Sequence, residues 1–212
     1  MHWRLKAYLA FFYICFFASR VLSHEISIDG KLDDPAWTSA DEYTKYYESL
    51  PFTLNEPKDF QKVLILEDEK GIYLGFINKQ DKETIRANRH ERDDEMANAD
   101  KAGLAIDFDG DGLAAYAFTV SAGGSIADGI YRNENEVNYD WDADWKSGVF
   151  IDQDYWYAEM FIPWSIAPMK AVNGDFREVK LSFWRLLAAE WRVNTTIKRN
   201  PRQEKFISLF HP

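Results

Sequence analysis

Apolar residues at every second position recur in short segments of the chain, and this alternation limits the fold more than any other feature. It is present in residues 102–108, 116–120 and 156–162. Successive side chains of a β-strand point to opposite faces of its sheet, so a period of two predicts strands with one buried face. Residues Phe60–Leu66 and Ile72–Asn78, joined by the turn EDEKG, predict a hairpin.

Turn-forming sequences separate the predicted strands. They lie at residues 69–71, 109–112, 122–124, 152–154 and 173–175. A late central strand is expected over Val179–Leu187, and helix only near Pro35–Ala40 and Glu91–Asn98. Many short strands with little helix predict an all-β fold, an antiparallel β-sandwich of the immunoglobulin or jelly-roll kind with minor helical segments.

Residues 1–23 predict a secretory signal peptide. Arg4 and Lys6 precede the uncharged stretch Ala7–Ala18, and cleavage is expected after Ser23. An uncleaved membrane anchor is the alternative, but the apolar stretch is well short of the ~20 residues that span a bilayer. We therefore expect a secreted or periplasmic protein with one domain, residues 24–212, and no membrane insertion after leader cleavage.

The mature chain is acidic and lacks cysteine. The full sequence has 25 Lys and Arg against 35 Asp and Glu, and the leader removes three bases and no acid, so the net charge changes from −10 to about −13. An acidic surface repels phosphate backbones and anionic lipids, so no nucleic-acid partner is expected. Cys15 lies in the leader, which excludes a disulfide scaffold and a thiolate site from the mature protein.

Six segments follow in an order that resembles a known family. They are IDGKLDDPAW (28–37), KVLILEDEKGIYLGFINKQD (62–81), ADKAGLAIDFDGDGLAAYAFTVSAGGSIAD (99–128), WDADW (141–145), YWYAEMFIPW (155–164) and FWRLL (183–187). The ordered set is similar to the family 9 carbohydrate-binding modules and their relatives. The resemblance implies an antiparallel β-sandwich, bound calcium in some members, and binding of glucan or xylan chain ends in members attached to xylanases. A close variant of the module also resembles the N-terminal part of large outer-membrane β-barrel proteins.

The sequence departs from that family at the residues that bind sugar. In alignment on Asp100, Ala97 takes the place of a tryptophan that forms one wall of an aromatic clamp. Gly103 and Thr119 take the places of an acid and an arginine that hydrogen-bond sugar hydroxyls. The resemblance therefore predicts the fold better than the binding mode. An envelope-associated protein-interaction module that has lost sugar binding is the alternative function. A glycoside hydrolase accessory and a haem-binding sandwich are the further alternatives.

The WDADW segment is the candidate sugar site. Sugar recognition needs aromatic faces and convergent polar groups. The predicted ligand-binding residues are Trp141, Asp142, Asp144 and Trp145, with Trp191 further along the chain. In the alternative interpretation Trp145 faces the core and Trp141 covers a sheet edge.

Two other tryptophans are expected to be structural. Trp37 closes the first motif and should pin the N-terminal segment onto the sandwich. Trp184 is, like Trp191, a further candidate for sugar binding, but it is expected in the core, because its neighbours alternate as strand residues do.

Asp107, Asp109 and Asp111, followed by Gly112, form the pattern DxDxDG and predict a calcium site. Three carboxylates on a tight loop supply the oxygen ligands that calcium prefers. No Glu closes the loop, and the context is strand, turn and strand, so a solvated acidic turn is the alternative.

Glu159 and Arg185 both fall in the middle of predicted strands. A buried carboxylate without a partner costs several kcal/mol, so we expect the two side chains to form a structural ion pair. A catalytic role for Glu159 would need a second carboxylate across a cleft, and no glycosidase motif accompanies it.

Some relatives of this sandwich bind haem b, which needs axial ligands inside the fold. The candidates in the mature chain are His90, Met96, Met160 and Met169, and no CxxCH motif is present. His90 and Met96 lie in a charged segment, so no haem is expected. We therefore expect a non-catalytic, exported carbohydrate-binding module that recognises a polysaccharide or oligosaccharide and serves carbohydrate catabolism. Its partner is a carbohydrate ligand or, in the alternative, an envelope protein.

Overall fold

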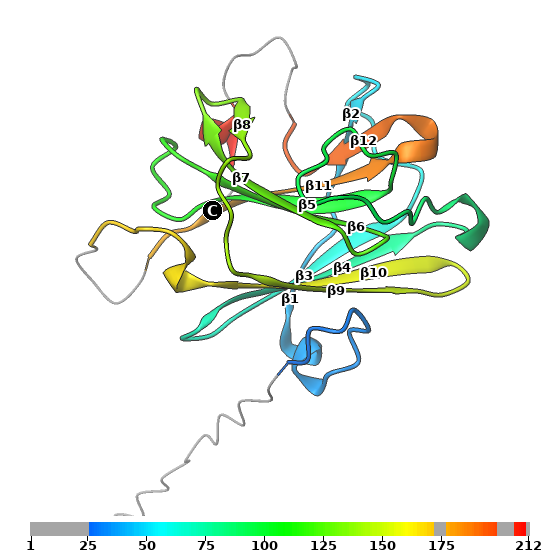
Figure 1. The fold of residues 1–212 in the computed structure, drawn as a ribbon, viewed down its shortest axis with the longest axis horizontal. Coiled ribbons are helices and arrows are strands. Elements are labelled where there is room, and N and C mark those ends of the chain that lie inside the picture. Colours follow the sequence, from blue (N-terminus) through cyan, green and yellow to red (C-terminus); the bar gives the residue numbers. More distant parts are fainter. Residues whose placement is uncertain (1–25, 172–176, 199–205, 211–212) are drawn as a thin grey trace, which may run out of the picture.

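Two antiparallel sheets face each other in the structure, a computed structural model that describes residues 26–171, 177–198 and 206–210 (Figure 1). The five-stranded sheet runs in the order β1 (Asp41–Tyr43), β3 (Gln61–Glu67), β4 (Gly71–Lys79), β10 (Tyr155–Pro163) and β9 (Lys146–Ile151). The seven-stranded sheet runs in the order β2 (Tyr47–Leu50), β12 (Arg192–Thr195), β11 (Lys180–Leu187), β5 (Lys101–Asp107), β6 (Tyr116–Ser121), β7 (Ile126–Arg132) and β8 (Glu136–Asn138). This confirms the predicted antiparallel β-sandwich. The predicted leader lies outside the described residues.

The helical content of the described residues consists of short 3₁₀ turns. They are η1 (Pro35–Ser39), η2 (Lys82–Thr84), η3 (Trp164–Ile166), η4 (Ala188–Glu190) and η5 (Ile207–Leu209). The first confirms the helix expected near Pro35–Ala40. The helix expected over Glu91–Asn98 is wrong, because this segment forms turns in which Asp94 bonds the backbone N–H of Met96. Short polar side chains compete in this way with helical hydrogen bonds.

The strands that the alternation predicts are present and pair as expected. β3 and β4 form the predicted hairpin, with Val63 opposite Phe76. β11 is central in its sheet, between β12 and β5. The inner faces of the two sheets bury Leu74, Leu104 and Trp156 completely. This apolar layer is the core of the sandwich.

The N-terminal segment packs on the outer face of the five-stranded sheet, below it in Figure 1. Glu159 of β10 holds it there: one carboxylate oxygen accepts the N–H groups of Asp29 and Gly30 at 2.8 and 2.7 Å, and the other accepts the indole N–H of Trp37 at 2.9 Å. Gly30 has a φ of 91°, and a Cβ there would come within 2.4 Å of the Val149 backbone. The predicted anchoring role of Trp37, which is buried, is confirmed.

The predicted ion pair between Glu159 and Arg185 does not form. Glu159 faces outward from the five-stranded sheet, whereas Arg185 of β11 is buried on the inner side of the other sheet. Arg185 donates to the carbonyl of Lys79 at 3.0 Å and to the side-chain oxygen of Gln80 at 2.7 Å. Gln80 in turn donates to Asp100 at 2.8 Å. Burial lowers the pKa of Arg185 to about 10, so its charge is retained at neutral pH and is balanced through this relay.

Candidate functional site

The outer face of the seven-stranded sheet carries an indole that the sequence analysis assigned to the core. Trp184 of β11 is opposite Thr195 of β12 and Gly103 of β5. A Cβ on Gly103 would lie 2.8 Å from two atoms of the Trp184 ring. The ring therefore lies over the glycine, and Phe183, the preceding residue, points into the core instead. The expectation that Trp184 is a core residue is wrong, because β11 has apolar side chains on both faces.

A C-terminal segment, residues 206–210, covers part of the same outer face. Ile207 and Phe210 are buried against Ala105 and Ile197. The Phe206 ring contacts the Tyr131 ring, with centroids 5.1 Å apart. This second apolar cluster is separate from the core between the sheets.

Glu134, in the turn between β7 and β8, holds the C-terminal segment in place. One of its carboxylate oxygens accepts the backbone N–H groups of Phe206 and Ser208 at 3.0 and 3.2 Å, and the other accepts the Ser208 hydroxyl at 2.7 Å. Three donors on one carboxylate fix the backbone that carries Phe206. Phe206 thereby becomes a fixed wall of the outer face.

A cavity of about 330 Å³ lies between the sheet and this segment. Among the described residues that line it, four have apolar or indole side chains, three bear hydroxyls, and none is charged: Trp184, Val193, Ile197, Phe206, Ser49, Tyr131 and Thr195. The size is at the lower end of the range for small-molecule sites, which are concave and mostly apolar with a few polar groups. We take this cavity as the candidate site. Its signal in the sequence is the tryptophan of FWRLL.

The WDADW segment does not form an aromatic clamp. Trp145 is only 7% exposed, and its ring lies edge-on to Phe118 at 5.4 Å. Trp141 is half-buried and packs on Tyr116 and Phe118, with centroids 5.0 and 6.0 Å apart. The structure thus matches the alternative interpretation, in which the two indoles are structural.

The remaining predicted ligand-binding residues lie apart from the cavity. Asp142 is exposed and pairs with Arg92 at 2.8 Å, and Asp144 is exposed. Trp191 follows η4, is 66% exposed and does not line the cavity. A role for these three in ligand binding stays a prediction without support from this geometry.

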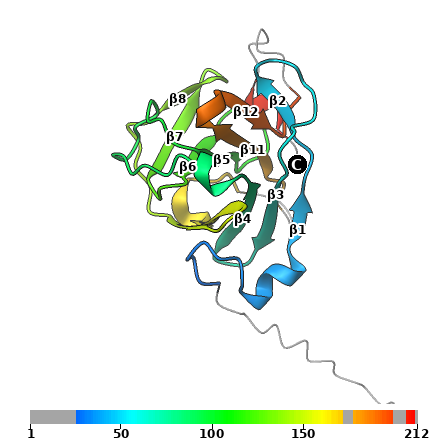
Figure 2. The same ribbon diagram turned by 90° about the vertical axis from the view of Figure 1, so that its right-hand side faces the viewer.

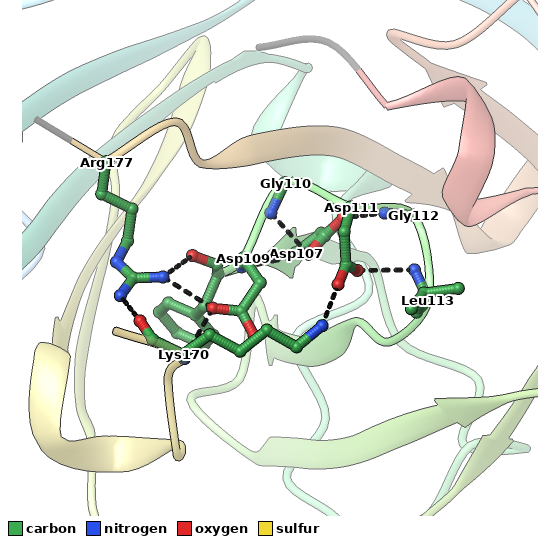
Figure 3. A network of polar contacts seen from close by, with 9 residues as sticks. Asp107, Asp109, Gly110, Asp111, Gly112, Leu113, Lys170 and Arg177 are labelled. Atoms are coloured by element: carbon green, nitrogen blue, oxygen red, sulfur yellow. Dashed lines mark hydrogen bonds and ion pairs between the residues drawn. The ribbon is translucent and has the colours of Figure 1, made fainter. Parts of the chain in front are cut away.

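The acidic DxDxDG loop is closed by hydrogen bonds and by two distant cations (Figure 3). Asp107 accepts the N–H groups of Asp109, Gly110 and Gly112 at 3.1, 2.9 and 2.7 Å. Asp109 accepts the Arg177 guanidinium at 2.6 Å, and Asp111 accepts the Lys170 ammonium.

These contacts use the oxygens that a metal would need. No group of three or more His, Cys, Asp or Glu side chains that could hold a metal ion occurs among residues 26–171, 177–198 and 206–210. As they lie, the three aspartates do not fit a calcium site, because two of them bond cationic side chains. The ammonium hydrogen bond lowers the pKa of Asp111, which shows the same pairing. Calcium binding stays a prediction from the sequence.

We expect Lys170→Gln to increase the response of the protein to calcium. The substitution removes the cation at Asp111 and leaves its carboxylate available, so calcium should bind the folded state more tightly and raise the melting temperature by mass action. The melting temperature is measured after chelation and again with calcium, for parent and variant. Lys146→Gln, on the exposed edge of β9, is the matched control. Equal shifts in all three proteins would show that Lys170 does not compete with calcium.

Two facing antiparallel sheets with a ligand-sized cavity on one outer face make this protein a β-sandwich. Its fold is that of the family 9 carbohydrate-binding modules. One such module from Caldicellulosiruptor kristjanssonii, solved with glucose, aligns with a TM-score of 0.59 and 14% identity over 88% of each chain. Its complex with cellotriose gives 0.56 and 15% over 87% of this chain and 86% of that one.

A third solved structure has the same fold. It is a candidate carbohydrate-binding protein from Bacteroides uniformis, with a TM-score of 0.61 and 13% identity over 88% of this chain and 92% of its own. No family model matches the sequence, and a search of curated proteins gives no match. Within the described residues, no helix is long and apolar enough to cross a membrane.

Proposed function

We propose that this protein is a non-catalytic carbohydrate-binding module whose ligand occupies the cavity beside Trp184. The observation that carries the proposal is the position of this cavity. An aromatic, ligand-sized hollow lies on an outer sheet face, in a fold shared with modules solved with glucose and cellotriose. The ligand class is a polysaccharide or oligosaccharide.

The lining chemistry suits one face of a sugar ring. The C–H surface of a pyranose is apolar and packs on an aromatic ring, while hydroxyl groups orient it. Trp184 supplies an indole, and Thr195, its neighbour on β12, supplies a hydroxyl at the same cavity. Gly103 is required here for its lack of a side chain, because any Cβ would displace the indole. Binding through Trp184 would differ from the binding mode of the family, in which an acid and an arginine at the positions of Gly103 and Thr119 hydrogen-bond sugar hydroxyls.

Export and a role in carbohydrate catabolism belong to the same proposal. Export rests on the signal peptide that residues 1–23 predict, and the catabolic role rests on the proposed sugar binding. An intact mass of the secreted or periplasmic protein that begins at His24 would support export. Full-length protein in the cytoplasm would count against export.

Trp184→Ala is expected to weaken glycan binding about 10- to 100-fold. Burial of a large apolar side chain contributes about 1.5–3 kcal/mol, and 1.4 kcal/mol corresponds to a factor of ten in affinity. Binding is measured by calorimetry against soluble oligosaccharides and by retention on insoluble polysaccharides. Trp191→Ala is the matched control, because this indole is exposed and lies outside the cavity.

The two variants separate the possible outcomes. Equal affinity of a folded Trp184→Ala variant and the parent would remove the cavity from the site. Loss of binding in Trp191→Ala alone would restore the sequence-based candidate. A parent that binds no glycan would overturn the proposed function and favour an envelope protein as partner.

A further inference from the structure

The cavity beside Trp184 offers little hydrogen bonding for its size. Of the lining residues that the structure describes, three bear a polar side-chain group other than the indole: Ser49, Tyr131 and Thr195. The Ser49 hydroxyl already donates to the carbonyl of Val193 at 3.2 Å, and the Thr195 oxygen accepts the N–H of Ile197 at 3.3 Å. Part of this small polar inventory is therefore committed to the protein itself.

The apolar side chains of the cavity come from two segments of the chain. Val193 and Ile197 belong to β12 and the segment after it, and Phe206 belongs to the C-terminal segment. Ile197 is buried in the same cluster as Phe210, so this wall is packed from behind and is not free to turn away. A ligand that fills the cavity must present an apolar group to it.

A sugar hydroxyl buried against such a wall would lose its hydrogen bonds to water without replacement. A methyl group in the same position would lose nothing and would gain apolar contact. A carboxylate would fare worse, because none of the described lining residues carries a positive charge.

From this balance we infer that the cavity selects neutral sugars that carry a methyl group in place of a hydroxymethyl group, that is, 6-deoxyhexoses. The inference rests on the proposed function and specifies its ligand class. The ring packs on Trp184, and the methyl group is placed against Val193, Ile197 and Phe206. A polysaccharide that bears 6-deoxyhexose residues is the corresponding natural ligand.

The test compares sugars that differ at one carbon. The probes are the methyl glycosides of three pairs: 6-deoxy-D-glucose with D-glucose, L-fucose with L-galactose, and L-rhamnose with L-mannose. Within each pair the ring stereochemistry is the same, so a difference in affinity reports the C6 hydroxyl alone. D-glucuronate adds a charge at the same carbon. Affinities are measured by saturation-transfer NMR and by quenching of tryptophan fluorescence.

We expect the 6-deoxy sugar to bind about 10- to 100-fold more tightly in at least one pair, with no pair reversed. Glucuronate is expected to bind most weakly. Val193→Thr, which adds a hydroxyl to the apolar wall at nearly constant shape, should narrow the difference. Val137→Thr on β8, outside the cavity, is its control.

Each outcome decides the inference or the proposal beneath it. If hydroxylated sugars bind as tightly as their partners, and Trp184→Ala abolishes this, the inference is overturned while carbohydrate binding stands. If no sugar binds, both fall. If Val193→Thr leaves the ratio unchanged while Trp184→Ala abolishes binding, the methyl group does not lie where the inference places it, which overturns it.

Discussion

Asp100→Ala is expected to lower the free energy of unfolding by about 3–5 kcal/mol, the range for loss of one partner from a buried charged network. Asp100 is fully buried at the start of β5. One of its oxygens accepts the side-chain amide of Gln80 and the N–H of Arg86 at 2.8 and 2.9 Å. The other accepts the N–H of Ala188 at 2.7 Å. Alanine would remove an acceptor from the buried Gln80 amide, which keeps the carbonyl of Thr84 at 3.3 Å, and from the part-buried N–H groups of Arg86 and Ala188. It would also remove one of the two acids, with Asp59, whose charge favours the Arg185 guanidinium.

Urea unfolding followed by tryptophan fluorescence measures the effect. Asp140→Ala, an exposed aspartate that bonds Asn138, is the matched control and should cost well under 1 kcal/mol. A second variant isolates the charge: Asp100→Ala combined with Arg185→Met should recover part of the loss, because the unbalanced guanidinium is then absent. A single-variant loss below 1 kcal/mol would show that water replaces the carboxylate at little cost.

Glu159→Ala should destabilise the sandwich by a similar amount, about 3–5 kcal/mol. The substitution leaves the N–H of Gly30 and the indole N–H of Trp37 without an acceptor in a buried position, whereas the N–H of Asp29 keeps the carbonyl of Ser27 as an acceptor at 2.9 Å. Burial also raises the pKa of the Glu159 carboxyl, an effect that these three donors oppose. The hydrogen bonds from these donors therefore offset the free-energy cost of burying a charged carboxylate at this position.

Thermal unfolding measures this prediction, with a decrease of roughly 2–4 °C in melting temperature per kcal/mol for a domain of this size. Glu42→Ala, which breaks an exposed pair with Lys62, serves as the control and should have little effect. Trp37→Phe removes one donor and, in a double-mutant cycle with Glu159→Ala, should show a coupling of about 1 kcal/mol or more. Additive losses would mean that the indole hydrogen bond contributes nothing to the anchor.

The sequence predicts the layers of this fold well, because the alternation of apolar residues follows directly from strand geometry. The hairpin of β3 and β4 and the anchoring role of Trp37 are examples. Partners across the sandwich are harder to predict. Apolar periodicity predicts that Glu159 and Arg185 are both buried strand residues. It does not indicate which sheet each strand joins, or which face of that sheet other segments cover.

The candidate site could be predicted only in part for a related reason. Trp184 lies in a strand with apolar side chains on both faces, so the sequence does not show which of them face the core. Trp141 and Trp145 are close together in the sequence, but both indoles pack against the ring of Phe118 on β6. The cations at the acidic loop, Lys170 and Arg177, are 59 residues or more away along the chain. Such contacts depend on the tertiary fold and not on local pattern.

The anchor at Glu159 and the cavity beside Trp184 lie on opposite outer faces of the sandwich (Figures 1 and 2). The described chain begins at the outer face of the five-stranded sheet, whereas the cavity lies on the outer face of the seven-stranded sheet. Sheets in a sandwich are about 10 Å apart, so two layers of side chains and backbone separate the two places. An uncleaved leader, the alternative to cleavage after Ser23, would join the described chain at Ile26, on the face opposite the cavity. The cavity would then face away from this attachment point and toward solvent, where a ligand much larger than the protein itself could reach it.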